Sequence, residues 1–255
     1  MKAHTRHAPI AVFDSGAGGI GVLRELQKAL PCEDFLYFGD ARMAPYGERK
    51  HDEIKALVLS HAARLLTTAK ALVVACNTDT AVAIDDLRRQ YQSKIIVGIE
   101  PAVCPALTVT AHPTVLILAT AATLKEQKLK NLLDAHRKDA DFIKLKAPLL
   151  VRLVEAGLGD SPEADAYLKE LLAPYLADPP DAIVLGCTHF PFAAKSIRRV
   201  MRRDIPLFDG AVGTARQVVR LLEARALLND QPKGSVTLLS SDPRALALYR
   251  RLLEA

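Results

Sequence analysis

The chain has 255 residues, 50% of them hydrophobic, and its 34 Lys and Arg against 29 Asp and Glu give a formal net charge of +5. Lys and Arg are dispersed rather than gathered in a long basic run, so direct nucleic-acid binding is not expected and small acidic ligands are favoured. No apolar stretch reaches the ~18–20 residues that span a membrane, and the polar N-terminus is unlike a leader peptide. The four cysteines form no CxxC pair. We therefore expect a cytoplasmic protein with reduced thiols, neither disulfide-stabilised nor membrane-bound.

Short apolar runs alternate with amphipathic segments along the whole chain. The first half reads as strand 9–13, helix 20–30, strand 35–38, helix 52–69, strand 71–75, helix 78–90 and strand 94–98. The second half reads as strand 114–119, helix 123–136, an extended run 142–146, helices 149–157 and 162–176, strand 182–185, helix 191–203 and strand 205–208. Helix 211–228, strand 235–239 and helix 243–254 finish the chain. This alternation predicts the α/β class, with mostly parallel sheets covered by helices on both faces.

The two halves resemble each other weakly. A strand followed by Asp14-Ser15 in the first half has a counterpart in a strand followed by Thr120 in the second. Likewise, the strand before Cys76 has a counterpart in the strand before Cys187. Ligands of open α/β sheets bind at the carboxyl ends of the strands. We therefore predict two pseudo-symmetric domains that face each other across a cleft, with one thiol on each side.

Cys76 and Cys187 each occupy a strand-to-helix turn. A single cysteine in that place is commonly an inert buried thiol. Two such turns, each with main-chain N–H groups and a helix N-terminus that favour a thiolate, point instead to chemistry. Two thiols suit inversion at an amino-acid α-carbon, because one removes the α-proton and the other delivers a proton to the opposite face. Neighbouring hydroxyl and amide groups can stabilise the carbanion through the α-carboxylate, and they are Ser15, Asn77, Thr78, Thr120, Thr123 and Thr188.

Three further residues are candidates for adjusting the thiols. Each also has a plain structural interpretation: Asp14 as a helix cap, Glu155 as part of a solvated helix face, and His189 as a turn histidine. For Glu155 the local pattern favours the structural interpretation. No lysine motif for pyridoxal phosphate is evident, and Cys187-Thr188-His189 lacks further ligands at zinc-like spacing, so neither a cofactor nor a metal is expected.

A glycine loop offers a competing interpretation. Residues 16–21 match GxGxxG directly after a strand, and Asp40 ends the next strand at about the distance of a ribose-binding acid. This pattern is typical of a dinucleotide-binding oxidoreductase. However, Asp14 beside the loop would repel a pyrophosphate, and the motif explains neither cysteine turn.

Five motifs taken together resemble the glutamate racemase family of the aspartate/glutamate racemase superfamily. They are Asp14-Ser15-Gly16-Ala17-Gly18-Gly19, Gly39-Asp40 with Pro45-Tyr46-Gly47, Ala75-Cys76-Asn77-Thr78, Thr120-x-x-Thr123 and Gly186-Cys187-Thr188-His189. The resemblance implies two α/β domains, 1–98 completed by 209–255, and 99–208. It also implies conversion of L-glutamate to D-glutamate without a cofactor, supplying peptidoglycan and hence cell-wall biogenesis and cell shape.

The same resemblance assigns roles to residues and partners. Cys76 and Cys187 would be the catalytic pair, assisted by Asp14, Glu155 and His189. The substrate-binding residues would be Asp14, Ser15, Tyr46, Gly47, Asn77, Thr78, Thr120, Thr123, Thr188 and His189. Expected partners are glutamate, a second copy in a homodimer, a peptidoglycan precursor as activator, and DNA gyrase. Two alternatives stay open: a racemase for aspartate or another amino acid, and a non-catalytic gyrase-binding protein.

Two residues depart from the family pattern. Asp79 follows Cys76-Asn77-Thr78 where a small residue is usual, and Ala122 replaces a frequent glycine between Thr120 and Thr123. A carboxylate at Asp79 could repel an acidic substrate, or it could serve the N-terminus of the following helix. Ala122 would narrow the pocket slightly.

Overall fold

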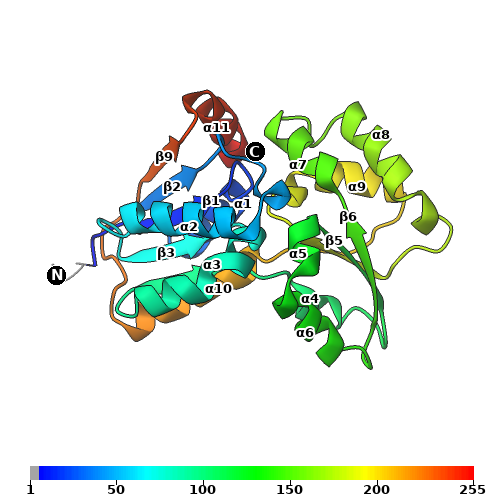
Figure 1. The fold of residues 1–255 in the computed structure, drawn as a ribbon, viewed down its shortest axis with the longest axis horizontal. Coiled ribbons are helices and arrows are strands. Elements are labelled where there is room, and N and C mark those ends of the chain that lie inside the picture. Colours follow the sequence, from blue (N-terminus) through cyan, green and yellow to red (C-terminus); the bar gives the residue numbers. More distant parts are fainter. Residues whose placement is uncertain (1–5) are drawn as a thin grey trace. The chain divides into compact units, whose positions relative to one another are not determined.

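The computed structural model describes residues 6–255 and divides them into two compact units (Figure 1). The first unit contains residues 6–99 and 211–255, so the chain leaves it once and returns to it. The second unit contains residues 100–210. Within residues 6–255, no helix combines the length and apolarity needed to cross a membrane.

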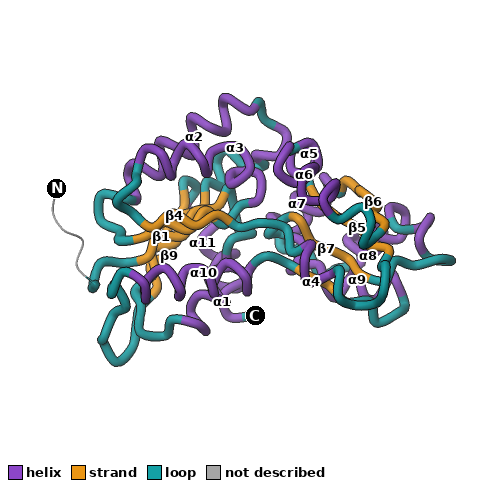
Figure 2. The backbone as a smooth tube through the Cα atoms, turned by 90° about the horizontal axis from the view of Figure 1, so that it is seen from below, coloured by secondary structure: helices purple, strands orange, loops and turns teal. Residues whose placement is uncertain are grey.

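The first unit is built on a five-stranded sheet in which all neighbouring strands are parallel. Its order is β4 (Ile95–Gly98), β3 (Ala71–Val74), β1 (Ile10–Asp14), β2 (Phe35–Gly39) and β9 (Val236–Ser240). Helices α2 (His51–Leu65) and α3 (Asn77–Gln90) cover one face, and α1 (Ile20–Ala29) and α10 (Ala211–Ala224) cover the other (Figure 2). Helix α11 (Leu246–Glu254) packs on α1 and β9. The 211–255 segment thus supplies an edge strand and two helices to this unit.

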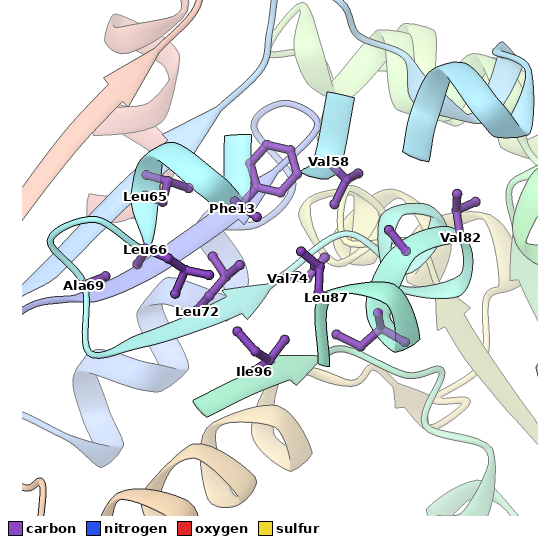
Figure 3. Packing of buried hydrophobic residues seen from close by; sticks show 14 of the residues in the cluster. Phe13, Val58, Leu65, Leu66, Ala69, Leu72, Val74, Val82, Leu87 and Ile96 are labelled. Atoms are coloured by element: carbon purple, nitrogen blue, oxygen red, sulfur yellow. The ribbon is translucent and has the colours of Figure 1, made fainter. Parts of the chain in front are cut away.

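The apolar core beneath α2 and α3 shows why these segments fold together (Figure 3). Helix α2 buries Ile54, Val58, Ala62 and Leu65, which recur at the spacing of one helix face. They pack against alternate residues of the central strands, including Phe13 of β1. Because all five residues of β1 are buried, its other side chains must pack on the opposite face of the sheet.

The second unit has a four-stranded parallel sheet in the order β6 (Asp141–Lys146), β5 (Thr114–Ala119), β7 (Ala182–Gly186) and β8 (Leu207–Phe208). Its helices are α4 (Val103–Ala106), α5 (Ala121–Lys125), α6 (Gln127–Ala135), α7 (Pro148–Glu155), α8 (Pro162–Leu171) and α9 (Ala194–Met201). Leu116 and Leu118 of β5 pack in the core formed by α7, α8 and α9. Val115 and Ile117 pack in the core formed by α4 and α6. One apolar strand therefore serves two cores, as period-two alternation requires.

Both sheets repeat one topology. In each, the first strand in the sequence lies between the second and the third, and the fourth follows the third. The chain thus reverses its direction of winding between the first and third strands, which are β1 and β3 in one unit and β5 and β7 in the other. Ligands of such sheets bind at the carboxyl ends of the strands at this switch point. The predicted α/β class, with parallel sheets flanked by helices, is confirmed.

Several helices differ from their predicted limits. The helix expected at 123–136 is broken at Glu126, whose extended backbone (ψ 134°) separates α5 from α6. The helix expected at 52–69 ends at Leu65. The one expected at 191–203 begins as a 3₁₀ turn, Phe190–Ala193, and stops at Arg202, which adopts a left-handed conformation (φ 52°). Hydrophobic spacing continues through these points, so it does not reveal where the backbone changes conformation.

Candidate active site

Cys76 lies one residue beyond the end of β3, at the N-cap of α3, and is buried, with 7% of its surface exposed. The β1–β3 register pairs Phe13 with Val74, so Ser15 and Cys76 follow side by side beyond the two strand ends. The Ser15 hydroxyl donates to Cys76 Sγ at 3.5 Å. Asn77 and Thr78 form the buried first turn of α3. The structure thus gathers these four predicted residues at the switch point of the first sheet.

Asp14 ends β1 and is fully buried. Its Oδ1 accepts a hydrogen bond from the main-chain N–H of Gly16 at 2.8 Å, so it organises the glycine loop. It does not cap α1, whose N-cap is Gly19 without a side-chain hydrogen bond. A Cβ atom added at Gly19 would lie 2.7 Å from Asp14 Cβ and 3.0 Å from Ala75 Cβ. The loop glycine is therefore needed for close packing against the Asp14 and Cys76 turns.

The surroundings of Cys76 oppose its ionisation. Burial is the largest cause that raises the pKa of this thiol well above its ordinary value, followed by the charges of Asp79 and Asp14. Hydrogen bonds from the Ser15 hydroxyl and the Asp79 main-chain N–H act in the opposite direction. Without further change in its surroundings, Cys76 is held as a thiol.

Tyr46 belongs to a buried polar cluster on the same unit. Its hydroxyl donates to Asp40 Oδ2 at 2.6 Å, and His61 Nε2 lies 3.1 Å from the same oxygen. Burial and the bond to Asp40 raise the pKa of the Tyr46 phenol. Gly47 follows in the same short 3₁₀ turn, Tyr46–Glu48. Asp40, the candidate ribose ligand of the dinucleotide interpretation, is instead engaged with Tyr46 and His61.

In the second unit, Cys187 follows β7 and is likewise 7% exposed. Its Sγ lies 3.7 Å from His189 Nδ1, and His189 Nε2 lies 2.6 Å from Glu155 Oε1 at the end of α7. Burial disfavours the charged ring of His189, but the hydrogen bonds to Cys187 and Glu155 outweigh it and raise the pKa of His189 well above its ordinary value. Glu155, Cys187 and His189 thus form a chain of polar contacts.

The predicted threonines lie beside this second thiol. Register pairs Ala119 with Gly186, so Thr120 and Cys187 follow their strands at adjacent positions. Thr120 caps α5 by accepting from the Thr123 N–H at 3.2 Å, and it donates to the Thr123 hydroxyl at 3.0 Å. Thr188 is buried next to Cys187.

Some of these contacts have no local signal in the sequence. Glu155 is only 21% exposed at its side chain and pairs with a histidine 34 positions away, so its interpretation as a solvated helix face is wrong. The sequence motifs do not include His61, whose ring packs on Phe13 and Phe38 with centroids 5.4 and 4.8 Å apart. Its place on the inner side of α2, one turn from buried Val58, is the one signal that could have indicated it. Across residues 6–255, no group of three or more His, Cys, Asp or Glu side chains is arranged to hold a metal ion.

Comparison with known proteins agrees with the motifs. The profile of the Asp/Glu/Hydantoin racemase family matches residues 21–218. A glutamate racemase from Clostridium acetobutylicum is 43% identical over 253 residues, which cover 98% of each chain. The crystal structure of Escherichia coli glutamate racemase with L-glutamate and the activator UDP-MurNAc-ala matches with a TM-score of 0.81 at 30% identity, covering 97% of this chain and 94% of that one. The Francisella tularensis glutamate racemase, solved with D-glutamate, matches with a TM-score of 0.83 at 26% identity, covering 98% and 95%.

The three glutamate racemases match nearly the whole chain and therefore both units, whereas the family profile begins at residue 21, after the first motif. They favour the racemase over the dinucleotide-binding interpretation of the glycine loop, because glutamate racemases match 97–98% of the chain that contains this loop. The chain belongs to the glutamate racemases, isomerases of the Asp/Glu/Hydantoin racemase family.

Proposed function

We propose that this chain interconverts L- and D-glutamate by a two-base reaction in which Cys76 and Cys187 act on opposite faces of the α-carbon. The observation that carries the proposal is the repeated placement of one buried thiol at the switch point of each sheet. The substrate assignment is supported by the L-glutamate and D-glutamate complexes of the Escherichia coli and Francisella tularensis relatives.

In the proposed reaction, one sulfur acts as thiolate and takes the α-proton, breaking the Cα–H bond and leaving its electron pair on the substrate. The other sulfur, as a thiol, gives its proton to the opposite face of the carbanion and becomes the thiolate. The product is the other enantiomer, and no atom is gained or lost. Positioned acid/base groups of this kind contribute about 10²–10⁴-fold to rate.

Side chains at the two strand-end sites have matching tasks. Hydrogen bonds from Ser15, Asn77, Thr78, Thr120, Thr123 and Thr188, with the Tyr46-Gly47 turn, would hold the substrate carboxylates and stabilise the carbanion. Asp14 would keep the glycine loop in place through Gly16. His189, oriented by Glu155, would exchange a proton with Cys187.

The biological setting follows from the same family. We propose that the D-glutamate supplies peptidoglycan in the cytoplasm, and that a cell-wall precursor regulates the enzyme. The activator UDP-MurNAc-ala in the Escherichia coli complex supports the latter. A homodimer is the proposed assembly.

The test is incubation with L-glutamate in D2O without cofactor, following optical activity and Cα deuteration. Loss of optical activity with deuterium uptake is expected for the wild type. Cys76→Ala and Cys187→Ala should each lower the racemisation rate by about 10²–10⁴-fold. Cys104→Ala, which removes an exposed thiol, serves as the matched control. Racemisation that persists in either Cys76→Ala or Cys187→Ala would exclude the two-thiol reaction.

A further inference from the structure

The titratable groups beside the two thiols differ. Cys76 is approached by Asp14 from β1, by Tyr46 from the 3₁₀ turn and by Asp79 from α3, and all three side chains are buried. The Tyr46 hydroxyl in turn donates to the carboxyl of Asp40, which also contacts His61 Nε2. The titratable groups that act on this sulfur are therefore two carboxyls and a phenol, and the Ser15 hydroxyl donates a hydrogen bond to it.

Cys187 instead lies beside an imidazole. His189 Nδ1 is 3.7 Å from its sulfur, and Glu155 on the other ring nitrogen favours the protonated ring. A proton leaving Cys187 can thus be kept on His189, with the resulting positive charge next to the thiolate. The hydrogen bonds to Cys76 come instead from two donors, the Ser15 hydroxyl and the Asp79 main-chain N–H.

Asp79 adds a second carboxyl to the surroundings of Cys76 and so increases the difference in acidity between the two thiol sites. It is the third residue of α3, its main-chain N–H contacts Cys76, and its side chain is 0% exposed. Cys76 is the N-cap of α3, so the Asp79 side chain belongs to the first turn of the helix that begins at this sulfur. Because solvent screens a buried charge less, a carboxylate at Asp79 opposes formation of the Cys76 thiolate.

We propose that Asp79 is a positioning residue that holds Cys76 as a thiol in the free enzyme, so that Cys187 starts turnover as the base. This inference rests on the proposed two-thiol reaction. The enantiomer whose α-proton faces Cys187 then binds the major form of the free enzyme, in which Cys76 is protonated and Cys187 is the base. The other enantiomer must bind a minor form in which the proton has moved from Cys76 to Cys187.

The kinetic consequence follows from symmetry. Two enantiomers have equal free energy in water, so kcat/KM must be the same in both directions. For the enantiomer that binds only the minor form of the enzyme, the apparent KM is raised by the inverse of the fraction of enzyme in that form. Because kcat/KM is fixed, kcat for that enantiomer must rise by the same factor. Asp79 should therefore produce unequal kcat values for L- and D-glutamate without making kcat/KM unequal.

The experiment uses Asp79→Asn and Asp79→Ala in the full chain, with two readouts. The first is the pH dependence of Cys76 alkylation by iodoacetamide, with Cys76 and Cys187 peptides distinguished by mass spectrometry. The second is kcat and KM from each enantiomer. Both substitutions should lower the alkylation midpoint of Cys76 by about one pH unit, which is about tenfold more thiolate at a fixed pH. The ratio of the two kcat values should move toward one.

Asp85→Asn, an exposed acid on the same helix, is the matched control and should change neither readout. An unchanged Cys76 midpoint in both Asp79 variants would overturn the proposal, and so would lower activity with an unchanged kcat ratio. If the wild type fails to racemise glutamate while the midpoint still shifts, the proposed function fails and the electrostatic role of Asp79 stands.

Discussion

At the scale of single residues, His189 shows how contacts can reverse the effect of burial. A buried imidazole ordinarily loses its proton more readily, because a low-dielectric interior disfavours charge. Here the bonds to Cys187 and Glu155 raise the pKa of His189 in spite of its burial. Since the folded pKa lies above the unfolded one of about 6.5, this interaction stabilises the fold most fully below that pH. The contribution is lost as the pH rises through the folded pKa.

Replacing Glu155 by Gln should lower the pKa of His189, because the variant removes the negative charge that favours the protonated ring. The measurement is the titration of the His189 ring proton by NMR, together with the pH profile of kcat. The basic limb of that profile should move to lower pH, with kcat reduced about tenfold or more. Glu170→Gln on α8 is the control. An unchanged His189 titration would contradict the assignment of Glu155.

Asp40 is a group whose pKa is lowered, not raised, by its contacts in the folded protein. Burial works against its charge, but hydrogen bonds from His61, Ser241 and Tyr46 outweigh burial and lower its pKa to about 2. A depressed carboxyl pKa stabilises the fold above the unfolded value of about 3.9, and this contribution is lost as the pH falls toward 2.

Asp40→Asn should therefore lower the free energy of unfolding by about 1–2 kcal/mol at pH 7. The difference from wild type should shrink between pH 4 and pH 2, as urea unfolding at several pH values would reveal. KM for glutamate should also rise, because the Tyr46 hydroxyl loses its charged acceptor and keeps at most the weaker amide oxygen. The exposed Asp52→Asn is the control, and a pH-independent difference would argue against this account.

At the scale of elements, each site depends on how closely a turn can approach its neighbour. The glycine loop between β1 and α1 has to pass beside Asp14 and Ala75, and Gly19 has a right-handed backbone (φ −64°) that any residue could adopt. Glycine is therefore required at position 19 because a side chain would collide with Asp14 and Ala75, and not because of the backbone conformation.

Gly19→Ala should destabilise the protein by about 1–3 kcal/mol, since the new methyl group forces Asp14 and Ala75 apart. Because Ala75 precedes Cys76, kcat/KM should fall about tenfold or more. Gly213→Ala is a matched control: nothing lies within 4 Å of a Cβ there, and it is in helix α10. That variant should instead gain about 0.5–1 kcal/mol at unchanged activity. Equal unfolding midpoints for the two variants would contradict the steric argument.

At the scale of the whole molecule, a buried ion pair joins distant parts of the first unit. Lys70 Nζ lies 2.5 Å from Glu33 Oε2, with both side chains essentially inaccessible. Lys70 also donates to the Leu227 carbonyl at 2.9 Å, and Glu33 Oε1 accepts from the Asn229 N–H at 2.8 Å. The pair thus connects the segment after α10 to the beginnings of the central strands.

Lys70→Met should lower the free energy of unfolding by about 3–5 kcal/mol, because it leaves the Glu33 carboxylate buried without its cation. Adding Glu33→Gln should recover part of that loss, as a double-mutant cycle by urea unfolding would measure. Lys28→Met, which breaks an exposed pair with Glu25, should change stability by less than about 1 kcal/mol. Additive losses in the double variant would show that the two charges do not interact.

The sequence by itself determined the α/β class, the order of the strands and of most helices, and the position of both thiols at strand ends, but it did not predict the short helix α4. These depend on hydrophobic periodicity and turn residues, which act over a few neighbouring positions. The sequence also indicated the family, because five short motifs occur in it in the order found in glutamate racemases.

Only the tertiary structure decided which distant side chains meet. Glu155 reaches His189, His61 reaches Asp40, and Lys70 reaches Glu33 through contacts between elements well apart in the chain. The break at Glu126 likewise has no signature in the apolar pattern. The physical reason is that a buried charge depends on the partner that folding places beside it, and local propensity contains no information about that partner.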